Sequence, residues 1–252
     1  MIPYRDENET QRRAIVTATI IGLNVFTWIV IQGAGADFPL AKSVCELGLI
    51  PGELTASLPV GTRFPMGPGL VCTTDPGLQI SHLITSMFLH GSWMHLLGNM
   101  WFLWIFGNNI EDSMGRLRFI AFYLITGLAA AFGQIVTNPD SVIPMVGASG
   151  AISGVMGAYL VLYPRVKVYA LIPIFIFFTS IALPAWVMLG YWFVIQFVSG
   201  LASSGETGGV AFWAHVGGFV AGVVLIKFFA RDEYIRAHRA HRWRPQRLMR
   251  DW

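Results

Sequence analysis

The chain of 252 residues is 54% apolar and only 12% charged, whereas soluble domains carry about 25% charged residues. Seventeen Lys and Arg against fourteen Asp and Glu leave a formal charge of +3, which is too small to indicate a nucleic-acid-binding protein. The composition therefore excludes an ordinary soluble domain and predicts an integral membrane protein.

Six apolar segments can each be a membrane span, because about 20 helical residues cross roughly 30 Å of hydrocarbon. Lipid leaves the backbone without hydrogen-bond partners, so these spans should be helices and the fold class all-α. The fourth segment, at fifteen residues, is shorter than the others. In chain order the predicted spans are 14–32, 93–110, 119–136, 149–163, 184–201 and 211–229.

A further apolar segment, 168–183, is a candidate seventh span. It follows Arg165 and Lys167 directly, contains Pro173 and ends beside Pro184. These features favour a segment that lies on the cytoplasmic face.

Lysines and arginines orient the six spans, since positively charged loops stay cytoplasmic. Fifteen of the seventeen fall on one side, so both termini are expected in the cytoplasm. The two on the outer side are Lys42 and Arg63. The cytoplasmic set comprises Arg5, Arg12, Arg13, Arg116, Arg118, Arg165, Lys167, Lys227, Arg231, Arg236, Arg239, Arg242, Arg244, Arg247 and Arg250.

The N-terminal segment has a basic flank, an apolar run and Ala-Gly-Ala at 34–36, so it also resembles a signal peptide. Its long apolar run favours an uncleaved first span, and the lack of a transit-like start favours a bacterial inner membrane.

We expect one integral domain at 14–230, preceded by a cytoplasmic N-terminus at 1–13 and followed by a basic cytoplasmic tail at 231–252. The long outer loop, 33–85, should be folded and partly embedded in the membrane. It holds Cys45 and Cys72, which either pair in an oxidising exterior or stay free. The tail is interpreted as a surface helix attracted to anionic lipid.

Two reactive side chains lie at membrane depth, Ser149 at the start of the fourth span and His215 in the sixth. Such groups are costly in lipid, so a functional role is the default interpretation. The fourth span is too short to cross the hydrocarbon, and its inner end is fixed by Pro164 and Arg165. Its start should therefore lie below the outer surface, where free backbone N–H groups favour negative charge.

Small residues predict which helices meet. Gly150 and Gly154 form one small face and Gly218 and Gly222 another, and such faces allow close helix packing. If these two faces meet, His215 comes near the start of the fourth span.

A third polar group lies on the second span, where His95 and Asn99 are four residues apart and share one helical face. Neutral donors there can stabilise an oxyanion. His90 is interpreted as a structural hydrogen-bonding group. The competing interpretation is a metal site formed by His90, His95 and His215, although no intramembrane Asp, Glu or Cys completes the usual ligand set.

Three motifs together resemble the rhomboid family of intramembrane serine proteases, as do the order of the spans and the segment Glu111-Asp-Ser-Met-Gly115. The motifs are His95-x-x-x-Asn99, Gly147-Ala148-Ser149-Gly150 and Ala214-His215-x-x-Gly218-x-x-x-Gly222, within roughly residues 81–229. The resemblance implies a six-helix rhomboid-like bundle with Ser149 as nucleophile and His215 as general base. It also implies an oxyanion hole from His95, Asn99 and the Ser149 amide, with no obligatory acid.

The chain departs from the family pattern in two places. The outer loop lacks the Trp-Arg pair of many members, and Ser153 stands where many bacterial members have an aromatic residue. The surface under the imidazole must therefore be built by another residue, for which Tyr159 and Trp213 are the candidates.

The leading functional hypothesis is a serine endopeptidase that cuts transmembrane protein substrates within the bilayer, with no metal, cofactor, ATP or nucleic acid. The alternatives are a pseudoprotease that binds membrane clients without cutting them and, more remotely, a solute transporter. The segment 202–209 is expected to be a lid and 184–201 a lateral gate, with Trp192 and Phe197 among its residues. The natural substrate and the oligomeric state stay open.

Overall fold

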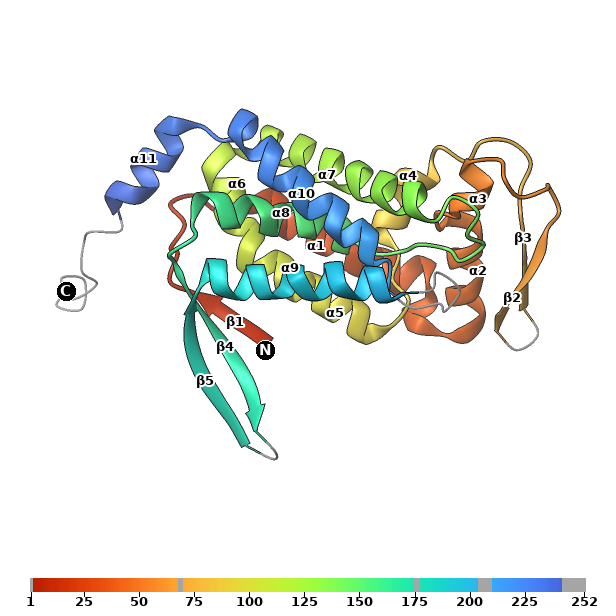
Figure 1. Cartoon of the computed structure of the whole chain (residues 1–252), viewed down its shortest axis with the longest axis horizontal. Helices are drawn as coiled ribbons and strands as arrows, with labels where there is room; N and C mark the ends of the chain where they lie inside the picture. The colour runs from red at the N-terminus through yellow and green to blue at the C-terminus, as the bar shows by residue number, and fades with distance from the viewer. Residues whose placement is uncertain (1, 68–69, 175–176, 204–209, 242–252) are drawn as a thin grey trace.

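The computed structural model describes residues 2–67, 70–174, 177–203 and 210–241 and is mostly helical (Figure 1). Five strands form two small sheets within these residues, so the all-α prediction is wrong in this respect. The elements in chain order are β1 Ile2–Asp6, α1 Ile15–Phe26, η1 Thr27–Ile31, η2 Gly33–Gly35, α2 Asp37–Leu47, α3 Pro51–Leu54, β2 Arg63–Gly67, β3 Leu70–Thr73, α4 His82–Thr85, η3 Ser86–Phe88, α5 Trp93–Phe102, η4 Leu103–Gly107, α6 Asn108–Met114, α7 Arg116–Thr137, α8 Ser149–Leu162, β4 Lys167–Ile174, β5 Phe177–Pro184, α9 Ala185–Ala202, α10 Phe212–Phe229 and α11 Asp232–His241.

A helix lies in each of the six predicted spans. By length and composition, α7, α9 and α10 are long and apolar enough to cross a membrane, whereas Ile15–Ile31 and Ser149–Leu162 are shorter apolar helices. The short fourth helix is therefore confirmed, at 14 residues. The count of six crossings stays a prediction.

The segment 168–183, predicted to lie on the cytoplasmic face, is not a helix. It forms the antiparallel pair β4–β5, and β1 adds to the free side of β4. The run is rich in β-branched and aromatic residues and contains Pro173, which favours strands over helix. The segment is therefore part of a three-stranded sheet, and its place at the cytoplasmic face stays a prediction.

Helix α8 is the centre of the bundle. Ten consecutive residues, from Gly150 to Tyr159, are buried, and the helix packs against α7, α9 and α10. A helix that is apolar on all sides is expected to be enclosed in this way.

Glycines set the distance between α8 and α10, as predicted. A Cβ on Gly218 would overlap the carbonyl oxygen of Gly150, and one on Gly222 would overlap that of Gly154. Backbone therefore lies against backbone, and no larger residue fits at either position.

Helix α1 is held at its start by a buried carboxylate. Glu111 on α6 accepts hydrogen bonds from the backbone N–H groups of Val16 and Thr17, at 3.0 and 2.8 Å, and from the Thr17 hydroxyl at 2.8 Å. These are the N–H groups that a helix start leaves unpaired. Glu111 thereby ties α1 to α6.

The two ends of the bundle differ. One end carries the outer-loop elements α2, α3, β2 and β3, and the other carries β1, β4, β5 and α11 (Figure 1). In the outer loop Cys45 and Cys72 form a disulfide, with 5.6 Å between their Cα atoms. This settles the open choice in favour of pairing, and it fits a loop that faces an oxidising compartment.

The contact between α8 and α10 can be tested with one methyl group. Gly222→Ala should lower the free energy of unfolding by about 1–3 kcal/mol because the methyl overpacks a closed contact. Gly190→Ala on α9 is the matched control, since a Cβ there meets nothing within 4 Å. Thermal unfolding in detergent would measure both variants, and equal melting temperatures would contradict the close packing.

Candidate functional site

The first residue of α8 is hydrogen-bonded to α10. Ser149 Oγ lies 2.8 Å from Nε2 of His215, as the meeting glycine faces predicted. No side chain caps the start of α8, so the N–H groups of its first turn keep their partial positive charge beside the hydroxyl. A hydroxyl, a base and free donors therefore meet at one helix end.

Gln196 on α9 orients the imidazole and was not found from the sequence. Its Oε1 lies 2.7 Å from His215 Nδ1, and the residue is 9% exposed. An amide oxygen only accepts, so Nδ1 carries the proton and Nε2 is left to accept from Ser149. The available signal was a lone amide in an otherwise apolar span.

The aromatic ring beside the imidazole is Trp192, with ring centroids 5.8 Å apart. The two candidates named from the sequence are wrong. Tyr159 lies between Phe106 and Tyr163, and Trp213 packs edge-on against Phe197. Helix α9 supplies this surface because it crosses α10 at the level of His215.

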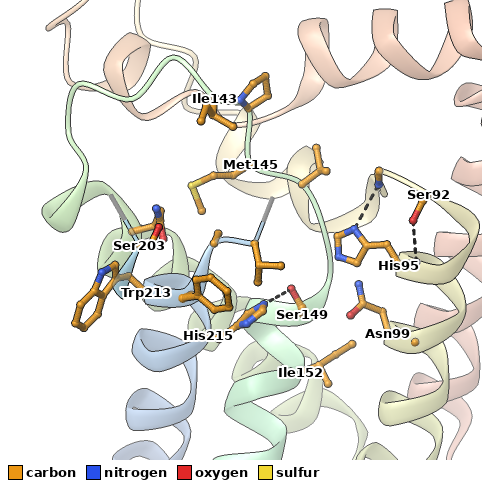
Figure 2. A pocket seen from close by; sticks show the side chains of 18 of the residues that line it. Ser92, His95, Asn99, Ile143, Met145, Ser149, Ile152, Ser203, Trp213 and His215 are labelled. Carbon is orange, nitrogen blue, oxygen red and sulfur yellow. Dashed lines mark hydrogen bonds between the residues drawn. The ribbon is translucent and has the colours of Figure 1, made fainter. Parts of the chain in front are cut away.

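His95 and Asn99 lie on the other side of Ser149 from His215 (Figure 2). The chain between them and Ser149 passes through Gly147, whose φ is +126°. A Cβ there would lie 2.7 Å from His95 Nε2, so only glycine lets the loop approach the helix. The Nδ2 of Asn99 is buried without a hydrogen-bond partner and is thus available as a donor.

Ser153, the other serine of α8, forms a hydrogen bond within its own helix. It is fully buried, and its hydroxyl donates to the carbonyl oxygen of Ser149 at 2.6 Å. It does not line the cavity described below. Its position supports Ser149 as the reactive hydroxyl.

His90 packs against His95. Its ring is fully buried, meets the His95 ring edge-on at 5.1 Å, and has no hydrogen bond at either nitrogen. Gln32 instead holds its backbone, with two hydrogen bonds of 2.8 Å. Burial and the neighbouring His95 lower the pKa of His90 to about 3, so the ring is neutral.

The metal-site interpretation finds no support in the described part of the chain. No three His, Cys, Asp or Glu side chains gather there in an arrangement that could hold an ion.

A cavity of about 680 Å³ joins these groups. Ser149, His215, His95 and Asn99 all line it, and apolar side chains such as Met145 and Ile152 form much of the wall (Figure 2). Residues 204–209 of the predicted lid lie outside the described residues.

A family model, the Rhomboid domain, matches residues 77–232. The chain belongs to the rhomboid family. The matched region contains every residue predicted for the site and the helices α5, α8 and α10 that carry them.

Curated relatives carry rhomboid names. Rhomboid-like protease 5 of Toxoplasma gondii is 33% identical over 170 residues, which cover 66% of this chain and 17% of the relative. RHOMBOID-like protein 5 of Arabidopsis thaliana is 38% identical over 133 residues, or 49% of this chain and 43% of the relative. Presenilin-associated rhomboid-like protein, mitochondrial, of Homo sapiens is 32% identical over 120 residues, or 45% and 31%. The chain thus spans less than half the length of each.

The role of Gln196 is testable through the reactivity of Ser149 toward a fluorophosphonate probe. Gln196→Leu should slow labelling by about tenfold or more, because it removes the acceptor that fixes the imidazole tautomer. Gln196→Glu keeps an acceptor at that place and should retain labelling, with a shifted pH profile. If the Leu and Glu variants label equally fast, Gln196 does not orient His215.

Proposed function

We propose that this rhomboid-family protein is an intramembrane serine endopeptidase that hydrolyses peptide bonds in or near transmembrane segments of other membrane proteins. The observation that carries the proposal is the 2.8 Å hydrogen bond between Ser149 Oγ and His215 Nε2 at an uncapped helix start. A serine hydroxyl is a weak nucleophile unless a base takes its proton, and this geometry supplies the base.

The reaction begins when His215 Nε2 takes the proton of Ser149 and Oγ attacks the substrate carbonyl carbon. The carbonyl oxygen then becomes an oxyanion, which the Ser149 amide, His95 and the unpartnered Nδ2 of Asn99 stabilise. The imidazolium gives its proton to the leaving amine, and an acyl-enzyme ester remains. A water molecule, deprotonated by His215, hydrolyses this ester and restores the hydroxyl.

Gln196 takes the place that a carboxylate has in a Ser-His-Asp triad. The amide accepts from Nδ1 and selects the tautomer, but it carries no charge to stabilise the imidazolium. The ring of Trp192 covers one side of the imidazole. The proposed dyad therefore depends on fixed geometry and on the donors of the oxyanion hole.

Substrate and water must both reach the cavity. We propose that α9 is the lateral gate, because its lipid-side residues are exposed and apolar, including Tyr191, Val194 and Val198. Trp192 is a poor site for testing this gate, since its truncation would also disturb His215. Phe197, which contacts Trp213 rather than the imidazole, is the better site.

The orientation is also a proposal. The basic loops and both termini face the cytoplasm, and the disulfide-bonded outer loop faces an oxidising compartment, as at a bacterial inner membrane. The expected partners are transmembrane protein substrates and the bilayer itself.

The proposal is tested by incubating purified protein in detergent with a model transmembrane substrate. Ser149→Ala should abolish cleavage and His215→Ala should nearly do so, because nucleophile and base act as a unit. Asn99→Ala should lower kcat by roughly 10²–10³-fold, the usual cost of one oxyanion donor.

Ser153→Ala is the matched control and should stay active, since the hydroxyl of Ser153 donates only to the backbone carbonyl oxygen of Ser149. Substrate that binds the wild-type protein without being cut would favour a pseudoprotease. Cleavage that survives Ser149→Ala but not Ser153→Ala would refute the site.

A further inference from the structure

A second cavity lies at the basic end of the bundle, far from Ser149 along α8. Its volume is about 310 Å³, and it is bounded by the chain before α1, by α6, by the first turn of α7 and by the start of α11. Arginines from three separate segments line it. They are Arg12, Arg13, Arg116, Arg118 and Arg231.

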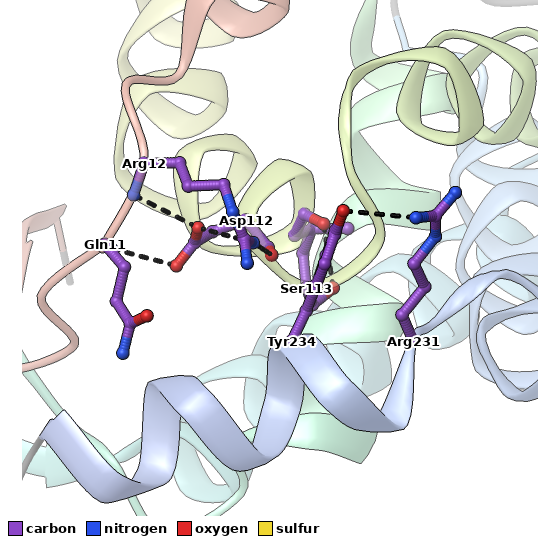
Figure 3. Close-up of polar contacts among 7 residues, drawn as sticks. Gln11, Arg12, Asp112, Ser113, Arg231 and Tyr234 are labelled. Atoms are coloured by element: carbon purple, nitrogen blue, oxygen red, sulfur yellow. Dashed lines mark hydrogen bonds and ion pairs between the residues drawn. The ribbon is translucent and has the colours of Figure 1, made fainter.

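The two carboxylates in this cavity do not neutralise the five arginines. Glu111 is turned to the start of α1. Asp112 accepts from the backbone N–H groups of Gln11 and Arg12, at 3.0 and 3.2 Å, and pairs with the Arg12 guanidinium (Figure 3). Five arginines and two carboxylates leave the side chains that line this cavity with a net charge of +3.

Two of the arginines are held through Tyr234. Arg12 lies over the ring of Tyr234 at 3.6 Å, and Arg231 donates to the Tyr234 hydroxyl at 3.1 Å (Figure 3). Together with the pair between Arg12 and Asp112, these contacts join the N-terminal segment, α6 and α11 into one wall. Arg13 and Arg116 are exposed and make no ion pair within the described residues, so their guanidinium groups are available to a ligand.

The backbone adds to the positive potential. Helix α7 begins at Arg116 without a side-chain cap, directly after Gly115 at a φ of +83°. The N–H groups of a first helical turn favour an anion, and guanidinium groups bind phosphate oxygens in pairs. The ligand chemistry that fits is therefore a phosphate group.

Apolar surface at the cavity distinguishes a lipid from a soluble anion. Leu117 lines the cavity and is 84% exposed, on the first turn of a helix long and apolar enough to span the membrane. A lipid whose phosphate binds the arginines would thus have its acyl chains along α7. Basic pockets between helices at this level bind anionic lipid headgroups.

We propose that this arginine-lined cavity is a binding site for the phosphate of an anionic phospholipid. The lipid bridges the N-terminal segment, α7 and α11, and so stabilises the basic end of the bundle. The site is separate from the Ser149 cavity and does not depend on the chain being a protease.

Native mass spectrometry of the delipidated full-length protein in detergent tests the site, with phosphatidylglycerol as the probe. Replacing both Arg13 and Arg116 by Gln should raise the apparent Kd about tenfold or more, because each arginine near a phosphate contributes appreciably to binding. The matched control replaces Arg165 and Arg236, which are exposed basic residues outside the cavity, and should change the Kd less than about twofold.

Three comparisons complete the experiment. The double variant Arg13→Lys, Arg116→Lys keeps the charge and should retain most of the binding, which separates loss of charge from misfolding. Phosphatidylcholine should bind weakly, and inorganic phosphate should not displace bound phosphatidylglycerol. Equal weakening by both Gln pairs would overturn the site in favour of general surface attraction. Equal binding of phosphatidylcholine, or displacement by inorganic phosphate, would overturn the assignment to an anionic lipid.

Discussion

The close contact between α8 and α10 is the constraint on which the site depends. At Gly218 and Gly222 the backbone of α10 lies against the carbonyls of α8 with no room for a Cβ. Since His215 lies one turn before Gly218, the same contact brings its ring within 2.8 Å of Ser149 Oγ. A shift of the helices by the width of one methyl group would break that hydrogen bond, so packing and proposed chemistry cannot be varied independently.

The positions of the polar residues follow from burial of the helices around them. Because α8 is enclosed on all sides and short, its uncapped start lies inside the bundle, at the wall of a cavity. Gly147 then lets the preceding loop lie against His95 and Asn99. The donors on α5 and the base on α10 therefore meet the same hydroxyl from two sides. The site needs no charged side chain at this depth, which avoids the cost of placing one in lipid.

Much of this arrangement could be predicted from the sequence, because helix periodicity and small-residue spacing are local signals. Reactive groups within apolar spans singled out Ser149 and His215, the four-residue spacing paired His95 with Asn99, and the glycine spacing indicated that α8 and α10 meet, while the roles of these residues came from the family resemblance. Gln196 and Trp192 were missed because α9 has no motif that fixes its rotation, and only tertiary packing shows which of its side chains reach His215. The β4–β5 hairpin was missed for a different reason. A continuous apolar run has no period that separates strand from helix, and pairing with distant β1 decides the outcome.

The central claim is that Ser149 and His215 act as one catalytic pair, and a reagent that reacts with both tests it most directly. A peptidyl chloromethyl ketone places its carbonyl carbon at the serine and its methylene carbon at the histidine, with loss of chloride. After proteolysis, mass spectrometry should find the inhibitor on the peptide that contains His215, because the alkylated ring nitrogen survives digestion whereas the hemiketal at Ser149 reverts. Ser149→Ala should slow this alkylation strongly, because the hemiketal holds the methylene carbon against the imidazole. Alkylation of His95 with His215 left free, or alkylation of His215 that is as fast in Ser149→Ala as in the wild type, would contradict the account.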